Sequence, residues 1–305
     1  MVLIHSRQTD DTTVEIIQWL FQQGKSIFRA NVPRDIKYVQ KAIDQSTLDS
    51  VYMNGLGMIY HNLEIDNDEL RSQTQNYIAK DIEILWTNLF EQGLAGLRTF
   101  GTLPFSNNSL SKLNVLLIAK SLELTVPPFE IIYTKNRLKE VKDKWKRIIC
   151  KGMAEGISIM TKEVMIFGQR TEEITSDAIS DFPDSFSPTF VQKLIDKAFE
   201  LRVFFFNHQI HSLACFTQAN KISQIDGRTV DAERPQRRVV FNLPEDLKVK
   251  ITMLAEKLKL NYGSFDFIVT PDHEFYFLEV NPYGQYGFLS KHGNFYLEKA
   301  IAEFL

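Results

Sequence analysis

The sequence predicts an α+β protein that begins with a small α/β unit and ends with an antiparallel sheet. Near the N-terminus, strands at residues 2–6 and 26–30 flank a helix over residues 12–22, which is the order of a βαβ unit. Towards the C-terminus, β-rich runs follow one another at residues 189–195, 200–206 and 210–216. Residues 263–282 then form two more such runs around the turn Pro271-Asp272-His273, which predicts a β-hairpin.

The composition is typical of a globular protein, and 305 residues are enough for two or three packed units. A net charge of -3 gives no reason to expect nucleic acid as a partner. No apolar run approaches the ~20 residues that a membrane helix needs, and the first residues lack the features of a signal peptide. We therefore expect a cytoplasmic protein with no membrane partner, in which Cys150 and Cys215 are buried free thiols.

The first 108 residues are expected to form an N-terminal α/β domain. Its first helix is expected to start at a capping box formed by Thr12 and Glu15 and to end before Gly24. A longer helix is expected over residues 68–90, which contain neither Pro nor Gly and carry apolar residues at helical spacing. The linker-like residues 103–109 set the end of this domain.

Residues 109–188 are expected to form a small central domain. Its predicted elements are a helix at 110–122 and strands at 129–133 and 145–151, followed by a polar linker at 171–188. The basic stretch at 135–147 is explained either by a solvated helix face or by a substrate-binding surface.

Residues 189–305 are expected to form the C-terminal domain. Besides the strands and the hairpin, it includes a polar, Arg-rich loop at 218–238, a helix at 244–260 and a terminal helix at 295–305.

The predicted hairpin brings two carboxylates face to face. If its strands pair symmetrically about the turn, Asp266 lies opposite Glu279, although like charges in opposed positions destabilise a sheet. Strand alternation puts Asn281 on the face of Glu279 and turns Leu278 and Val280 to the other face. Two carboxylates and a carboxamide suit Mg²⁺, which prefers oxygen ligands and often keeps substrate phosphates. The hairpin therefore indicates an enzyme that handles a nucleoside triphosphate.

Several basic residues could serve such a site, and each also has a structural explanation. Lys151 ends an apolar strand, where it either neutralises phosphates or is simply exposed, and Lys112 has the same two explanations. Glu200 and Arg202 share a strand face, either as a surface ion pair or as site residues.

The polar loop before residue 238 supplies further charged residues. The loop contains Asp226, Arg228 and Arg237. Either these residues are simply solvated, or the two arginines stabilise charge during phosphoryl transfer. No P-loop or Gly-rich dinucleotide motif is present, and strand spacing separates His208 from His211, so these histidines are not expected to share a metal.

Together these residues resemble the ATP-grasp superfamily, through Lys112, Lys151, Glu200-Leu201-Arg202-Val203, Asp266 and Glu279-Val280-Asn281-Pro282. More narrowly, nearly the whole chain is similar to the ATP-grasp peptide maturases that make graspetides, particularly the grasp-with-spasm branch. That narrower likeness is carried by residues 11–20, 190–193, 226–228, 281–287 and 294–302.

The resemblance implies an ATP-grasp fold, with an N-terminal α/β domain, a central lid domain and a C-terminal antiparallel-sheet domain, and with ATP between the last two. It implies a ligase that uses ATP and Mg²⁺ to phosphorylate Glu or Asp side chains of a ribosomal precursor peptide. Ser, Thr or Lys side chains of that peptide, which has a leader and a core, would then close ester or amide rings. A homodimer is also implied.

Two alternatives remain open. One is an ATP-grasp carboxylate–amine ligase that joins a free amino acid to a peptide or small acid. The other is a catalytically silent ATP-binding module that only escorts a peptide.

The resemblance also implies roles for individual residues. Lys112 and Lys151 would bind the ATP phosphates, and Arg202 and Arg237 would lie at the transferring phosphate. The residues implied to line the adenine are Gln192, Lys193, Leu194 and Ile195, with Glu200 facing ribose or substrate. Those implied to bind Mg²⁺ are Asp266, Glu279 and Asn281, and those implied to receive the core peptide are Asp226 and Arg228. Gly227 stands where relatives have an aromatic residue, which gives this loop a glycine's backbone freedom.

Overall fold

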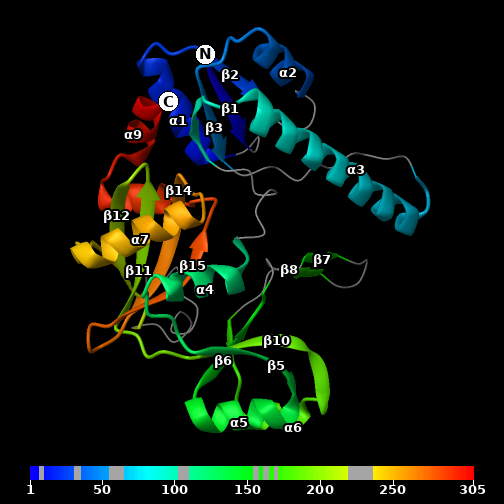
Figure 1. The fold of residues 1–305 in the computed structure, drawn as a ribbon, viewed down its shortest axis with the longest axis vertical. Coiled ribbons are helices and arrows are strands. Elements are labelled where there is room, and N and C mark those ends of the chain that lie inside the picture. The colour runs from blue at the N-terminus through cyan, green and yellow to red at the C-terminus, as the bar shows by residue number, and fades with distance from the viewer. Residues whose placement is uncertain are drawn as a thin grey trace.

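The computed structural model describes residues 1–6, 10–30, 36–54, 65–101, 110–153, 158–160, 165–167, 171–218 and 236–305. Three main sheets follow one another along the long axis, with the first sheet at the top of Figure 1, the third in the middle and the second at the bottom. Both chain ends lie beside the first sheet. Among the described residues, no helix combines the length and the apolar character that a membrane crossing requires.

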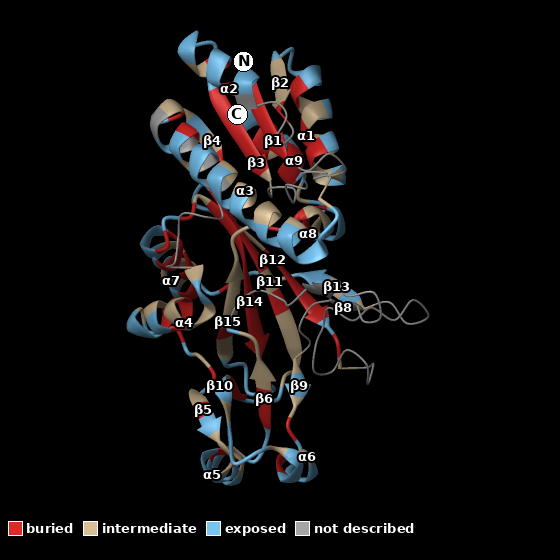
Figure 2. Cartoon of the chain, turned by 90° about the vertical axis from the view of Figure 1, so that its right-hand side faces the viewer, coloured by how far each residue is buried: buried red, intermediate tan, exposed pale blue. Residues whose placement is uncertain are grey.

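The first sheet is parallel and belongs to the predicted N-terminal α/β unit. Its strand order is β2-β1-β3-β4, made by Ile27–Ala30, Val2–Ser6, Ser50–Asn54 and Arg98–Phe100. The helices of this unit are α1 (Asp11–Gln22), α2 (Ile36–Asp44) and α3 (Asp68–Asn88), and α3 continues into a π-helical turn at Leu89–Gly93. Figure 2 shows that α3 is mostly exposed.

The expected capping box at the start of α1 is wrong. The N-cap residue is Asp10, in an extended conformation, and its carboxylate accepts from the backbone N–H of Thr12 (3.2 Å). Because Asp10 already binds this first-turn donor, the N-cap lies two residues before the predicted one and the helix begins at Asp11.

The second sheet is antiparallel and forms the lower end of the molecule. Its strand order is β5-β10-β6-β9, made by Phe129–Thr134, Ser185–Lys193, Ile148–Lys151 and Glu172–Glu173. Helices α5 (Lys135–Trp145) and α6 (Ser176–Asp181) pack on one face, where Leu138, Val141 and Ile179 meet Ile148 and Val191. The basic stretch is thus an amphipathic helix whose charged face lies outside. A separate two-stranded sheet is formed by β7 (Ser158–Met160) and β8 (Met165–Phe167).

Two expectations for this region need correction. The strand predicted at 145–151 starts only at Ile148, because α5 runs to Trp145 and Lys146 ends it with a φ of 66°. The polar run at 171–188 is not a plain linker, since it contains β9, α6 and the start of β10. The expected limit between residues 188 and 189 falls inside β10, and the domain limits stay a prediction.

The third sheet carries the predicted hairpin. Its order is β13-β12-β11-β14-β15, made by Arg237–Val240, Gln209–Phe216, Phe199–Phe206, Tyr262–Val269 and Phe275–Asn281. Helices α4 (Lys112–Ser121) and α7 (Glu245–Lys257) bury one face in the largest hydrophobic core. On the other face, α8 (Gly287–Gly293), α9 (Leu297–Phe304) and the first sheet form a second core.

The hairpin pairs Asp266 with Glu279, as predicted. Beyond this pair the register shifts by one residue, so that Phe267 opposes Phe277 and Leu278 has no partner position in β14. Phe277 and Val280 therefore both pack against the core under α4 and α7, although strict alternation would separate them. The bulge at Leu278 sets the direction of Glu279.

Candidate functional site

Three charged residues form one row across the third sheet. Arg202 of β11 lies beside Asp266 of β14, which lies beside Glu279 of β15. The guanidinium of Arg202 donates to Oδ2 of Asp266. Adjacent strands are about 4.8 Å apart, so this row concentrates two carboxylates and a cation in a narrow strip. Figure 2 shows the buried strands β11 and β14 at the middle of this sheet.

The alternation of β11 explains why the row lies where it does. Leu201 and Val203 point into the core under α4 and α7, so Arg202 points to the opposite face. On that face, Phe204 and Phe206 are buried beneath the N-terminal unit and the last helices. One strand face is thus apolar where the first sheet covers it and charged where it continues towards the second sheet.

Lys112 adds a second cation to the row. It is the first residue of α4, and its Nζ lies 3.3 Å from Oε2 of Glu279. Each carboxylate of the row therefore has its own basic partner, Arg202 for Asp266 and Lys112 for Glu279.

The donor set fits Mg²⁺. Asp266 is only 8% exposed, and its Oδ1 has no hydrogen-bond partner among the described residues, so a buried anionic oxygen is left for a cation. The side-chain oxygen of Asn281 accepts from the backbone N–H of Tyr283 (2.9 Å), which fixes its direction. No cluster of three His, Cys, Asp or Glu residues occurs among the described residues. The remaining ligands would therefore be phosphates and water, as is usual for Mg²⁺.

A second group of predicted residues lies on the second sheet. Gln192 opposes Ile149, and Lys151 opposes Phe190, so strand spacing puts Gln192 and Lys151 on one face. This is the face away from α5 and α6, because Val191 points into the core beneath those helices. Phe190 joins the core under α4 and α7, so this face looks towards the third sheet.

The residues from Gln192 onwards are firmly held. Gln192 is 1% exposed, and its Oε1 has no hydrogen-bond partner among the described residues. Lys193 and Leu194 donate their backbone N–H groups to the carbonyls of Pro128 (2.8 Å) and Arg147 (3.0 Å), while Ile195 is buried. This segment thus offers a buried side-chain acceptor beside a backbone that is fixed by hydrogen bonds.

Arg237 and Arg238 lie on opposite faces of β13. Arg237 opposes Phe216, and its guanidinium lies 5.4 Å from the centre of that ring. Phe216 packs against Phe199, which belongs to the face covered by α7. Arg237 is thus not brought to the row.

Arg238 reaches the face that Arg237 does not. It opposes Cys215, which opposes Glu200. Burial raises the pKa of the Cys215 thiol, whereas the positive charges of Arg202 and Arg238 lower it. Nε of Arg238 is buried without a hydrogen-bond partner among the described residues. The sequence missed Arg238 because β13 was expected to be loop.

The other predicted residues are placed as follows. Glu200 lies on the Arg202 face and pairs with Lys197 (2.5 Å). Asp226 and Arg228 lie outside the described residues. Cys150 and Cys215 are free, and the first is half-buried.

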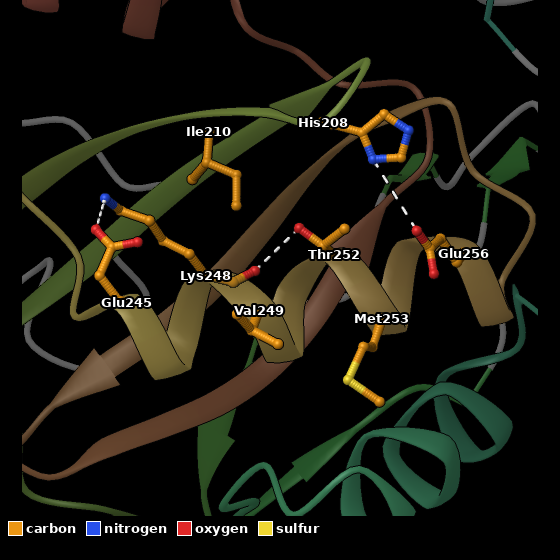
Figure 3. Close-up of a pocket in the computed structure, with 8 residues that line it drawn as sticks. All are labelled: His208, Ile210, Glu245, Lys248, Val249, Thr252, Met253 and Glu256. Carbon is orange, nitrogen blue, oxygen red and sulfur yellow. Dashed lines mark hydrogen bonds and ion pairs between the residues drawn. The ribbon is translucent and has the colours of Figure 1, made fainter.

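A separate pocket of about 430 Å³ lies between α7 and the turn that joins β11 to β12. Figure 3 shows its lining, in which His208 approaches Glu256 at 4.0 Å and Lys248 pairs with Glu245. None of the predicted site residues lines this pocket.

No protein-family model and no curated protein matches the sequence. Solved structures do match. Macrocyclase MdnC from Microcystis aeruginosa MRC, bound with the precursor peptide MdnA, has a TM-score of 0.77 at 21% identity and covers 100% of this chain and 99% of its own. A RiPP-associated ATP-grasp ligase from Chryseobacterium gregarium, in complex with ADP and a leader and core peptide, has a TM-score of 0.79 at 20% identity, with coverage of 99% and 94%.

A third match is the ATP-grasp ligase PsnB, complexed with a phosphomimetic variant of its minimal precursor, Mg and ADP. It has a TM-score of 0.73 at 15% identity and covers 99% of this chain and 96% of its own. These likenesses extend over whole chains rather than over one shared motif. The protein therefore has the ATP-grasp fold, in the form that these peptide ligases share from end to end.

Proposed function

We propose that this protein is an ATP-dependent ligase that closes side-chain rings in a ribosomally made precursor peptide. The observation that carries the proposal is the row of Arg202, Asp266 and Glu279, set in a fold whose matched structures hold ADP, Mg and precursor peptides. An acidic pair with its own basic partners is suited to a metal-bound triphosphate, because both sets of charges find partners when the nucleotide enters.

The nucleotide would lie between the second and third sheets. Gln192 to Ile195 would receive the adenine, supported by the buried Oε1 of Gln192 and the bonded backbone of the next two residues. Lys151 and Lys112 would bind the phosphates from the two sides. Asp266, Glu279 and Asn281 would hold Mg²⁺, which when bound neutralises charge that develops during phosphoryl transfer.

The reaction would proceed in two steps. A Glu or Asp carboxylate of the peptide attacks the γ-phosphorus of ATP, the bond to the β–γ bridging oxygen breaks, and ADP leaves. A Ser or Thr hydroxyl or a Lys amine then attacks the acyl carbon, phosphate leaves, and the nucleophile's proton passes to solvent. Arg202 would stabilise the transferring phosphoryl group, with Arg237 or its neighbour Arg238 as the second arginine.

The peptide partner would comprise a leader and a core. Asp226 and Arg228 are proposed to receive the core. The domain limits at residues 108 and 188, a homodimer and a cytoplasmic location complete the proposal. Light scattering on the purified protein tests the dimer.

The decisive experiment uses the full chain with ATP, Mg²⁺ and a candidate precursor peptide encoded beside its gene. The expected product has lost one water per ring, as measured by intact-mass spectrometry, and Asp266→Ala should abolish this loss. A product of higher mass would favour the ligase that adds a free amino acid. An unchanged peptide while ATP is consumed would overturn both activities.

A further inference from the structure

The chain passes from the second sheet to the third through a short turn between β10 and β11. The backbone N–H of Leu194 donates to the carbonyl of Arg147, just before β6 (3.0 Å), which ties the start of the turn to the second sheet. The N–H of Ala198 donates to the carbonyl of Val269 in β14 (2.7 Å), which ties its end to the third sheet. The crossing is therefore confined to residues 195–197, and Lys197 is its last residue.

Lys197 makes a buried ion pair with Glu200. Its Nζ lies 2.5 Å from Oε1 of Glu200, and only 5% of the lysine side chain and 12% of the glutamate side chain are exposed. Removing two charges from water costs free energy that their attraction does not fully return, so such a pair is weak evidence for stability. The buried pair is better explained by a role in holding the Glu200 carboxylate in one position.

Glu200 is the residue whose geometry the pair fixes. It lies on the same strand face as Arg202, two residues away, and on the side of Arg202 that leads to the crossing turn. Its position is therefore between the charged row and the segment at Gln192 to Ile195. In the proposed nucleotide site, the ribose lies between the phosphates and the base.

We propose that Lys197 is a positioning residue that holds the Glu200 carboxylate for the ribose hydroxyls. This inference rests on the proposed function, since it requires a nucleotide in the site. With Oε1 occupied by Lys197, Oε2 keeps lone pairs that can accept from a hydroxyl. Without Lys197, a largely buried carboxylate loses its counterion and rotates towards water.

The test compares ADP with 2′,3′-dideoxy-ADP by titration calorimetry on the full chain. In the unaltered protein, the dideoxy analogue should bind about tenfold more weakly, because hydrogen bonds to a charged acceptor are lost. Lys197→Met should weaken ADP binding about tenfold and leave the analogue nearly unaffected, so that the preference disappears. Lys197→Arg should restore the preference, because it keeps the buried cation.

Two further variants separate a positioning role from general damage. Lys248→Met removes another Lys–Glu pair three residues apart (2.6 Å), in which the glutamate side chain is 85% exposed, and should change neither affinity. In a Glu200→Gln background, Lys197→Met should have no further effect on the preference. Circular dichroism checks that each variant is folded, and Lys197→Gln replaces Lys197→Met if the latter does not fold.

The outcomes are distinct. A Lys197→Met protein that keeps the full preference for ADP, or an unaltered protein that binds both nucleotides equally, overturns the positioning role. Failure of the unaltered protein to bind ADP at all overturns the proposed function instead.

Discussion

Arg202 donates a hydrogen bond to Oδ2 of Asp266, its direct neighbour across β11 and β14. Lys112 makes the corresponding contact with Glu279, at 3.3 Å. In the proposed site, Arg202 and Lys112 would move onto phosphates while Asp266 and Glu279 bind the metal. The four charges that pair with one another here would then pair with the nucleotide and the metal instead.

This exchange predicts that the divalent cation binds weakly without nucleotide. Mn²⁺, followed by electron paramagnetic resonance, should bind at least tenfold more tightly when ADP is present. Lys112→Met should strengthen Mn²⁺ binding to the nucleotide-free protein roughly tenfold, because a cation at ion-pair distance competes with the metal. The same variant should weaken ADP binding.

Lys248→Met, which removes an exposed lysine on α7, serves as the control for total charge. Equal Mn²⁺ affinity with and without ADP, in a protein that does bind ADP, would show that the carboxylates are not masked by their basic neighbours.

The two arginines at the start of β13 give a second prediction. Arg238 lies on the face of Glu200 and Arg202, whereas Arg237 lies over the Phe216 ring on the other face. Arg238→Ala should therefore lower kcat for ring closure roughly 100-fold, the usual effect of removing a group that stabilises developing charge. Arg237→Ala should cost less than about threefold, because exposed side chains away from the site have small effects. If Arg237→Ala lowered kcat more than Arg238→Ala, Arg237 would instead be the arginine that stabilises the transferring phosphoryl group.

Local sequence patterns predicted many of the helices and strands, but they did not contain two kinds of information about the fold. The opposition of Asp266 and Glu279 was expected from symmetric pairing about the turn. The structure has this pair, although the register shift between it and the turn breaks the symmetry. The bulge at Leu278 was not expected, because Leu278 ends the apolar and aromatic run Phe275-Tyr276-Phe277-Leu278 and the sequence does not mark which of these residues is extra.

Strand pairing between distant segments was the second missing part. Arg238 was assigned to a loop because nothing near it in the sequence signals its partner Cys215. Likewise Pro188 favoured a linker, yet it lies in β10, at the irregularity between Ser185 and Thr189 where a missing N–H is tolerated.

Gln192 gives a prediction on base preference. Its Oε1 is a buried acceptor without a partner among the described residues, so it can accept from the 6-amino group of adenine. Guanine offers a carbonyl oxygen there, which would leave two acceptors facing each other. Gln192→Met should weaken ADP binding about tenfold and reduce the preference for ADP over GDP by a similar factor, both measured by calorimetry. A Lys139→Met protein, altered on the outer face of the second sheet, should keep both values. An unchanged preference in Gln192→Met would place the base elsewhere.

His5 predicts how stability depends on pH. It lies in β1 of the first sheet, is 1% exposed, and its Nδ1–H donates to the carbonyl of Ala30 (3.1 Å). Burial lowers the pKa of this imidazole to about 4, from 6.5 in the unfolded chain. The unfolded state therefore binds the proton first as pH falls, so His5 stabilises the fold fully above pH 6.5 and loses this contribution between 6.5 and 4. The loss amounts to about 3 kcal/mol of unfolding free energy.

Urea titrations of His5→Gln should show an unfolding free energy that depends correspondingly less on pH. His273→Gln, at the exposed hairpin turn, should keep the pH dependence of the unaltered protein. Equal slopes in all three proteins would mean that His5 is protonated as readily in the folded chain as in the unfolded one.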